Sequence, residues 1–228
     1  MNDIVLRVER MTSFSQEAKL ENIGLSLQAG SCLALAVPDT EQRRLLLRSL
    51  VGAVPITEGI IELNGVPIEE ETPLARVTSG MGIILPRAVN ESMFPDERVF
   101  SQSYMGYQKF SLSGVQRGIP WVGNKKSYRS FKKDFQIHVR GPLSPEMFIL
   151  YDVHIEPDCE YGKLFLESML AFRNKGGAVL LITTDLGPYL KYIDRAGIVH
   201  DGRMLGLVDN QGDMLQTLQM LGGSLLHA

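Results

Sequence analysis

Apolar residues recur along this chain with two spacings, which distinguish predicted strands from predicted helices. Alternating apolar and polar positions predict strands at residues 3–9 and 20–28. Mostly apolar runs, typical of strands that are covered on both faces, lie at residues 32–37, 82–85, 147–152 and 178–183. Helical spacing predicts helices after residue 44 and at residues 73–78, 160–173, 186–192 and 213–221. The mixture indicates a fold of the α/β class.

Two short turn signals predict hairpins. Asn64-Gly65 lies between apolar runs and predicts a hairpin over residues 57–68. Asp201-Gly202 similarly joins predicted strands at residues 196–199 and 204–208.

Composition narrows the possible functions. The 228 residues are 44% hydrophobic, which is ample for a packed core, and the net charge of −3 gives no general signature of nucleic-acid binding. No apolar run reaches the length of a membrane span, and the first residues lack the form of a signal peptide, so we expect a cytoplasmic protein. Cys32, Cys159 and the four histidines show no ligand spacing, so we expect no metal held by side chains.

Residues 31–52 follow the layout of a phosphate-binding loop: a buried strand, a short loop and a helix. In the motif G-x-x-x-x-G-K-[ST], the glycines let backbone N–H groups curl around a phosphate, while lysine and hydroxyl serve phosphate and magnesium. The same register here reads Val-Pro-Asp-Thr-Glu-Gln-Arg-Arg over residues 37–44. Both glycines, the lysine and the hydroxyl are replaced.

These replacements have physical consequences for a phosphate. Gln42 carries a Cβ where the motif needs free torsions, and Pro38 donates no N–H. Asp39 and Glu41 bring negative charge towards the same place, which costs about 1–4 kcal/mol per close pair of like charges. Arg43 and Arg44 could still hold an anion. Alternatively, they are solvated charges in the first turn of the helix.

The order of these parts resembles that of an ATP-binding-cassette (ABC) ATPase, in particular the second cassette of the ATPases that drive ribose- and galactose-type importers. The segments that carry the resemblance are Ala29-Gly30, residues 64–68, 72–75 before Gly80, 84–86, 181–186, 193–195 and 200–204. It extends over nearly the whole chain and is weakest between residues 95 and 145. It implies a P-loop NTPase-like α/β core with an N-terminal antiparallel β subdomain and a reduced helical subdomain, all in one domain of residues 1–228.

The resemblance assigns residues 1–86 and 141–228 to the β subdomain and core, and residues 87–140 to the helical subdomain. The segment 104–140 mixes basic and aromatic side chains on an otherwise acidic chain. One hypothesis is that it binds nucleic acid or anionic lipid headgroups. The alternative, which we favour, is a helix around residues 124–136 whose aromatic residues pack while its lysines face water.

The positions that the family uses for magnesium and for the catalytic base are incomplete. One register places Tyr151 at the magnesium acid and Asp152 at the catalytic glutamate; the other makes Asp152 the magnesium acid and leaves Val153 at the base. Neither register supplies both acids.

The family's other functional groups also depart from its pattern. No Leu-Ser-Gly-Gly-Gln signature occurs; its ungapped positions are residues 127–131, and a deletion after residues 134–138 is the alternative. Arg87 stands at the sensor loop and Thr184 at the switch histidine. Phe14 stands where the family stacks an aromatic ring on adenine, or it is a core residue.

These departures predict a degenerate ABC-transporter-like subunit that does not hydrolyse ATP and serves as a structural or regulatory partner in a sugar-type transport system. We therefore expect no catalytic residues and no resident cofactor. If nucleotide with magnesium binds at all, the residual positions are Phe14, Arg43, Arg44 and Asp152.

The resemblance also suggests partners and alternatives. A permease or an intact ABC ATPase subunit is the expected partner, a homodimer is possible, and the partner would hold the chain at the inner face of the membrane. The alternatives are a weak ATPase of a carbohydrate importer, with Arg43 in place of lysine, and a binding module that uses segment 104–140.

Overall fold

The computed structural model describes residues 4–86, 137–140, 145–153, 160–210 and 214–222. The strands are β1 Ile4–Phe14, β2 Lys19–Gln28, β3 Cys32–Ala36, β4 Glu58–Leu63, β5 Val66–Pro67, β6 Met81–Pro86, β7 Ile137–Arg140, β8 Met147–Tyr151, β9 Ala178–Thr183, β10 Arg195–His200 and β11 Arg203–Asp209. The helices are α1 Thr40–Leu50, α2 Pro73–Thr78, the 3-10 helix η1 Gly187–Tyr189, α7 Glu160–Asn174 and α8 Met214–Gly222.

A seven-stranded sheet forms the centre of the fold, with the order β11-β10-β3-β9-β8-β6-β7. The five inner strands pair in parallel, whereas β11 and β7 pair antiparallel at the two edges. Four of the five inner strands, β3, β6, β8 and β9, are the mostly apolar runs of the sequence, as expected for parallel strands that are covered on both faces. Strand β7 is an element that the sequence pattern did not predict.

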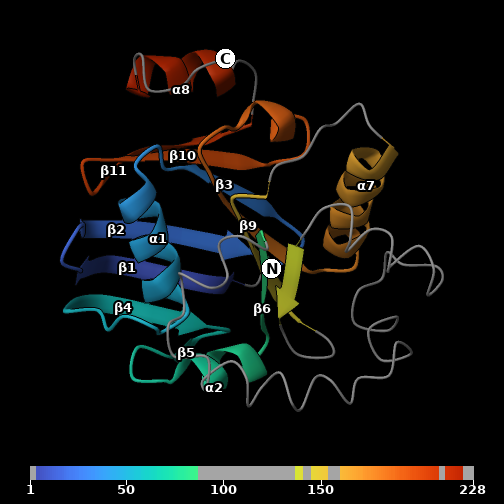
Figure 1. Cartoon of the computed structure of the whole chain (residues 1–228). Helices are drawn as coiled ribbons and strands as arrows, with labels where there is room; N and C mark the ends of the chain where they lie inside the picture. The colour runs from blue at the N-terminus through green and yellow to red at the C-terminus, as the bar shows by residue number, and fades with distance from the viewer. Residues whose placement is uncertain (1–3, 87–136, 141–144, 154–159, 211–213, 223–228) are drawn as a thin grey trace.

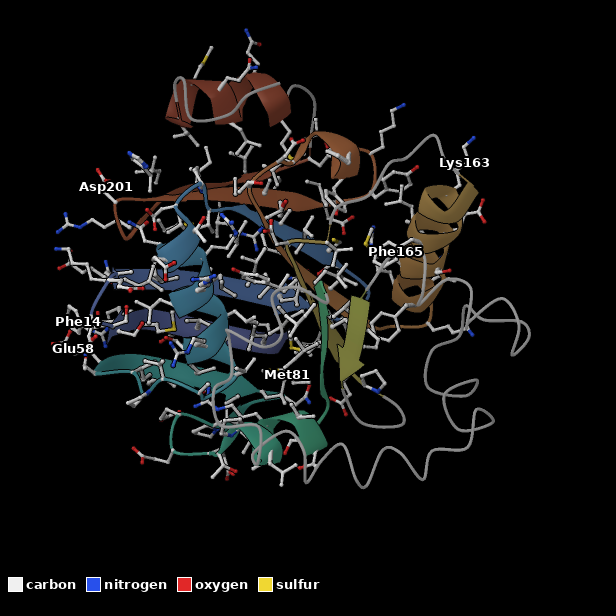
Figure 2. All side chains as sticks on the ribbon, in the orientation of Figure 1. Phe14, Glu58, Met81, Lys163, Phe165 and Asp201 are labelled. Carbon is white, nitrogen blue, oxygen red and sulfur yellow. The ribbon has the colours of Figure 1, made fainter. Side chains whose placement is uncertain are left out.

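Successive residues of β3 belong to two separate hydrophobic clusters. Leu33 and Leu35 pack with α1 and the N-terminal strands. Ala34 and Ala36 pack in the cluster that contains residues of α7, η1 and α8, among them Phe165. This division follows from the two-residue period of a strand. Figure 1 shows α1 and α7 on different sides of the central sheet, and Figure 2 shows Phe165 on α7.

A four-stranded antiparallel sheet, in the order β2-β1-β4-β5, covers the side of the core that holds α1 (Figure 1). Its hairpin between β4 and β5 turns at Asn64 and Gly65, whose φ angles are 53° and 75°. Positive φ at both central residues is the geometry that Asn-Gly favours, so the predicted hairpin is confirmed. The predicted antiparallel subdomain is therefore present.

Hydrogen bonds with distant segments fix both ends of α1. The buried guanidinium of Arg76 donates to the carbonyls of Ser49 and Leu50 at 2.9 Å each, which satisfies two groups at the C-terminal end of the helix. Near the other end, Gln42 Oε1 accepts a hydrogen bond of 3.0 Å from the N–H of Gly202. The carbonyl of Gly202 in turn accepts from the N–H of Glu21 at 2.7 Å. These contacts join α1, the β10–β11 turn and β2.

Several predicted elements have the bounds that the sequence indicated. Helix α2 and strand β9 coincide with their predictions, and the predicted helix at residues 186–192 is shorter, as η1. The predicted helix at residues 124–136 and most of segment 104–140 lie outside the described residues. Among the described helices, none combines the length and the apolar character that crossing a bilayer requires.

Candidate functional site

The candidate site lies at the carboxyl ends of three adjacent central strands, β3, β9 and β8. The N–H of Val37, just after β3, donates to the carbonyl of Thr183 at the end of β9 (2.8 Å). The N–H of Asp152, just after β8, donates to the carbonyl of Ile182 (2.8 Å). In open α/β sheets, ligands bind at this edge. The topology therefore brings segment 37–44 and Asp152 to one place.

The loop after β3 is short. Helix α1 begins at Thr40, so five of the eight residues in the motif register 37–44 are already helical. The reason is Asp39, which caps the helix: its Oδ1 accepts from the N–H of Gln42 at 2.7 Å. The N–H of Arg43 donates to the carbonyl of Asp39 at 3.0 Å, as a helical residue does. Arg43 and Arg44 therefore lie near the start of the helix, where the second alternative placed their backbone.

Arg43 points back under this short loop and is 4% exposed. Its Nη1 donates to the carbonyls of Val37 at 2.7 Å and Pro38 at 3.1 Å. Its Nη2 lies 3.4 Å from Thr40 Oγ1 and 3.4 Å from Asp152 Oδ2. The alternative that Arg43 is a solvated charge was therefore wrong for this residue, because its guanidinium bonds to the backbone that would surround a phosphate.

Tyr151 and Asp152 face this arginine from the end of β8. Burial raises the pKa of Tyr151 to about 12, and the neighbouring charge of Asp152 acts in the same direction while Arg43 opposes it. A phenol is neutral at physiological pH even at its ordinary pKa, so Tyr151 offers no anionic oxygen, and burial makes its ionisation still less favourable. Asp152 adopts a φ of 47° and forms an ion pair with Arg43. The carboxylate of this strand end is thus engaged by an internal cation.

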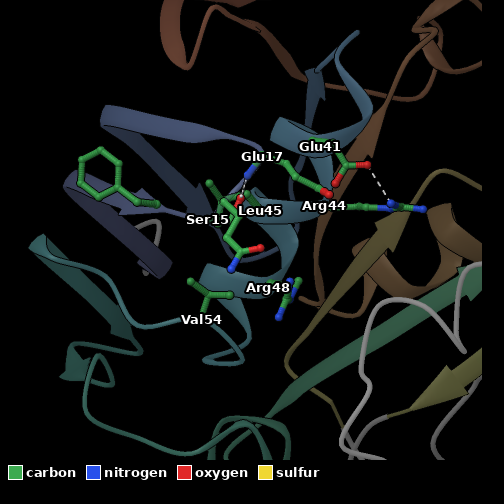
Figure 3. A pocket seen from close by; sticks show the side chains of 9 residues that line it. Ser15, Glu17, Glu41, Arg44, Leu45, Arg48 and Val54 are labelled. Atoms are coloured by element: carbon green, nitrogen blue, oxygen red, sulfur yellow. Dashed lines mark hydrogen bonds and ion pairs between the residues drawn. The ribbon is translucent and has the colours of Figure 1, made fainter.

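Arg44 and Phe14 lie around a different feature, a pocket of about 390 Å³ between helix α1 and the turn that joins β1 to β2. Arg44 Nη1 forms an ion pair of 2.7 Å with Glu41 one turn earlier, and both residues line the pocket (Figure 3). Phe14 ends β1 with 49% of its surface exposed. Figure 2 shows it at the outer end of the antiparallel sheet. The alternative that Phe14 is a core residue was wrong.

The four candidate residues therefore separate into two groups. Arg43 and Asp152 contact each other at the sheet edge, whereas Phe14 and Arg44 line the pocket. Thr184 is exposed after β9, while Arg87 and residues 127–131 lie outside the described residues. Within the described ranges, no group of three or more His, Cys, Asp or Glu side chains is placed to hold a metal ion.

The sequence analysis missed the capping role of Asp39. An Asp followed three residues later by Gln is a helix-start signal, and Asp39 and Gln42 have this spacing. Here Gln42 does not complete the capping box, because its side chain accepts from Gly202. The cap rule by itself would nevertheless have placed the start of α1 at Thr40.

Sequence comparison relates the chain to importer proteins. No family model matches it. It is 24% identical over 227 residues to "Ribose import ATP-binding protein RbsA" of Geobacillus kaustophilus, covering 91% of this chain and 45% of the relative. It is 21% identical over 249 residues to "Nucleoside import ATP-binding protein NupA" of Lactococcus lactis subsp. cremoris, covering 98% of this chain and 49% of the relative. The chain thus spans about half the length of these curated relatives.

Solved structures show the same fold. A nucleotide-free ATP-binding cassette from an ABC transporter superimposes with a TM-score of 0.68 at 14% identity, covering 95% of each chain. A cassette in its ADP conformation gives a TM-score of 0.66 at 15% identity, covering 96% of this chain and 98% of the other. The fold of the present chain is that of these cassettes.

Proposed function

Because the chain is homologous to the ATP-binding domains of sugar and nucleoside importers and has the cassette fold, we propose that it is a cassette-type importer subunit that does not hydrolyse ATP. Its role would be structural or regulatory, beside an intact cassette or a permease. Catalysis by P-loop proteins consists mainly of positioning and of stabilising charge on phosphate. The proposal therefore depends on which groups occupy the place of the phosphates.

The observation that carries the proposal is the position of the Arg43 guanidinium. It bonds to the carbonyls of Val37 and Pro38, so the loop presents its backbone to an internal cation. A phosphate-binding nest instead directs N–H groups at its ligand. In this chain the N–H of Gln42 already donates to Asp39, and Pro38 has no N–H. An incoming triphosphate would have to displace the Asp39 carboxylate from the helix terminus.

The residues at the end of β8 do not fit a magnesium ion with its attacking water. Tyr151 is a neutral phenol at physiological pH, and burial raises its pKa further, to about 12. Asp152 is paired with Arg43, and a guanidinium beside the carboxylate disfavours a second cation there. A hydrolytic site needs both a metal ligand and a group that orients water. These contacts support a subunit without that chemistry.

Purified chain incubated with magnesium and ATP tests the proposal directly. We expect phosphate release no faster than in a buffer control, and no heat of binding in calorimetry at millimolar nucleotide. Asp152→Ala provides the decisive comparison. Magnesium-dependent turnover that disappears in this variant would refute the proposal.

One observation favours a second candidate, a weak ATPase. The structure places Arg43 and Asp152 in contact, and these are the residues that would replace the lysine and the acid. In this case ATP would have to separate the two side chains when it binds. Because each of them would then act on the nucleotide, Arg43→Ala and Asp152→Ala would each remove activity. A variant that raises turnover instead would exclude this assignment.

Purification of the chain from native cells tests which proteins bind to it. We expect an intact cassette or a permease to accompany the chain, held at the inner face of the membrane by that partner. Recovery of the chain without either protein, under conditions in which a known importer stays assembled, would contradict this role. The binding-module alternative concerns segment 104–140, most of which lies outside the described residues.

A further inference from the structure

The pocket beside α1 has the volume of a small-molecule site and a mostly polar lining. Its volume of about 390 Å³ lies within the range of about 300–1,000 Å³ for such sites. One wall is the turn after β1, which Ser15 stabilises because its Oγ accepts from the N–H groups of Glu17 and Ala18 at 3.3 and 3.0 Å. The opposite wall is α1, and Val54 lies at the lower end of the view in Figure 3.

The two arginines that line this pocket differ in their partners. Arg44 is paired with Glu41 at one end of the pocket. Arg48 lines it one turn further along α1, and Val54 belongs to the same lining (Figure 3). The Nε of Arg48 is buried and has no hydrogen-bond partner among the residues that the structure describes. A buried N–H of a charged group is costly to leave without an acceptor.

We propose that this pocket binds a small organic oxyanion, a carboxylate or a phosphate monoester, with its charged group on Arg48. A planar guanidinium binds such groups through two parallel hydrogen bonds. The apolar part of the ligand contacts Leu45 and Val54, which line the same pocket. The exposed ring of Phe14 lies on its rim and adds a further apolar surface.

The acids of the pocket limit the charge of this ligand. Glu17 and Glu41 both line it, so a polyphosphate would meet two carboxylates while it gained one unpaired guanidinium. A ligand with a single charged group avoids this repulsion. The pocket includes Glu41 from the first turn of α1 and two of the residual nucleotide positions, Phe14 and Arg44. Comparison with ATP therefore distinguishes a small oxyanion from a nucleotide at this place.

Calorimetric titration of the full chain with phenyl phosphate, benzoate and ATP tests this site. We expect phenyl phosphate or benzoate to bind more tightly than ATP. Arg48→Gln should raise the Kd of the bound probe at least tenfold, the loss expected for one charge-assisted contact. Arg203→Gln is the matched control, because Arg203 is an exposed arginine paired with Glu21 on another strand, and it should leave the Kd unchanged.

Protection from chemical modification gives a second measurement that needs no variant. Phenylglyoxal reacts with accessible arginines, and the probe should protect Arg48 but not Arg203, as measured by mass spectrometry of the wild-type peptides. Absence of binding by both probes at millimolar concentration would overturn the proposal. An unchanged Kd in Arg48→Gln, or tighter Arg48-dependent binding of ATP, would overturn it as well.

Discussion

The Nη2 atom of Arg43 lies 3.4 Å from Oδ2 of Asp152, although 109 positions separate the two residues in the chain. The same guanidinium holds the carbonyls of Val37 and Pro38. Arg43→Ala removes all these bonds at a buried position, so we expect the free energy of unfolding to fall by about 3 kcal/mol. Urea unfolding followed by circular dichroism measures this difference.

The neighbouring arginine serves as the control for that measurement. Arg44 makes a partly exposed ion pair with Glu41, and such pairs contribute about 0–1 kcal/mol. Arg44→Ala should therefore leave the urea midpoint almost unchanged. Equal losses in the two variants would contradict the assignment of Arg43 as the arginine that holds the loop.

Asp39 should stabilise α1 through its cap. Asp39→Ala removes the acceptor for the N–H of Gln42, and the expected loss of unfolding free energy is about 1 kcal/mol. Asp39→Asn keeps an acceptor oxygen at the same position and should lose much less. Thermal unfolding of the two variants in parallel distinguishes the contribution of the capping hydrogen bond from that of the negative charge. If Asp39→Asn lost as much stability as Asp39→Ala, the carboxylate would have a role other than capping.

Tyr151 should make stability depend on alkaline pH. Its pKa is raised in the folded chain from 10.0 to about 12, chiefly by burial. A phenol with a raised folded pKa contributes stability that is complete below pH 10 and is lost as pH rises towards about 12, with a slope approaching 1.4 kcal/mol per pH unit. Urea midpoints between pH 8 and 11.5 should fall less steeply in Tyr151→Phe than in the wild type. Parallel curves would exclude this residue as the source.

Replacing Arg76 by lysine should lower the free energy of unfolding, although the positive charge is kept. Its guanidinium donates to four carbonyls, those of Ser49, Leu50, Glu69 and Glu71, and is 1% exposed. Lysine keeps the charge but cannot reach several acceptors in one plane, so Arg76→Lys should cost about 2–4 kcal/mol. Arg7→Lys, at an exposed arginine of β1, should cost almost nothing in the same urea titration.

The sequence predicted most of the fold because its signals are local. The Asn64-Gly65 turn has the positive φ angles that these residues favour, and the run at residues 178–183 has the apolar character of a strand covered on both faces. Strand β7 was not predicted, since its pairing with β6 depends on residues far apart in the chain. The boundaries of the predicted helical subdomain remain a prediction.

The candidate site was predicted less well, for a physical reason. The sequence predicted that Arg43 and Asp152 lie near the same sheet edge, but it did not predict the direction in which their side chains point. The buried Arg43 is stabilised by carbonyls and a carboxylate from two segments, and no local pattern records those partners. Arg48 was missed because its significance depends on the turn that lies opposite it.

The β10–β11 turn that contacts Gln42 has room only for glycine at position 202. Gly202 adopts a φ of +76°, and a Cβ added there would lie 2.4 Å from the carbonyl oxygen of Lys19. A larger residue would therefore push β2 away from this turn and disturb the hydrogen bonds of Gly202 with Gln42 and Glu21. The alignment of α1, the turn and β2 thus depends on the absence of one side chain.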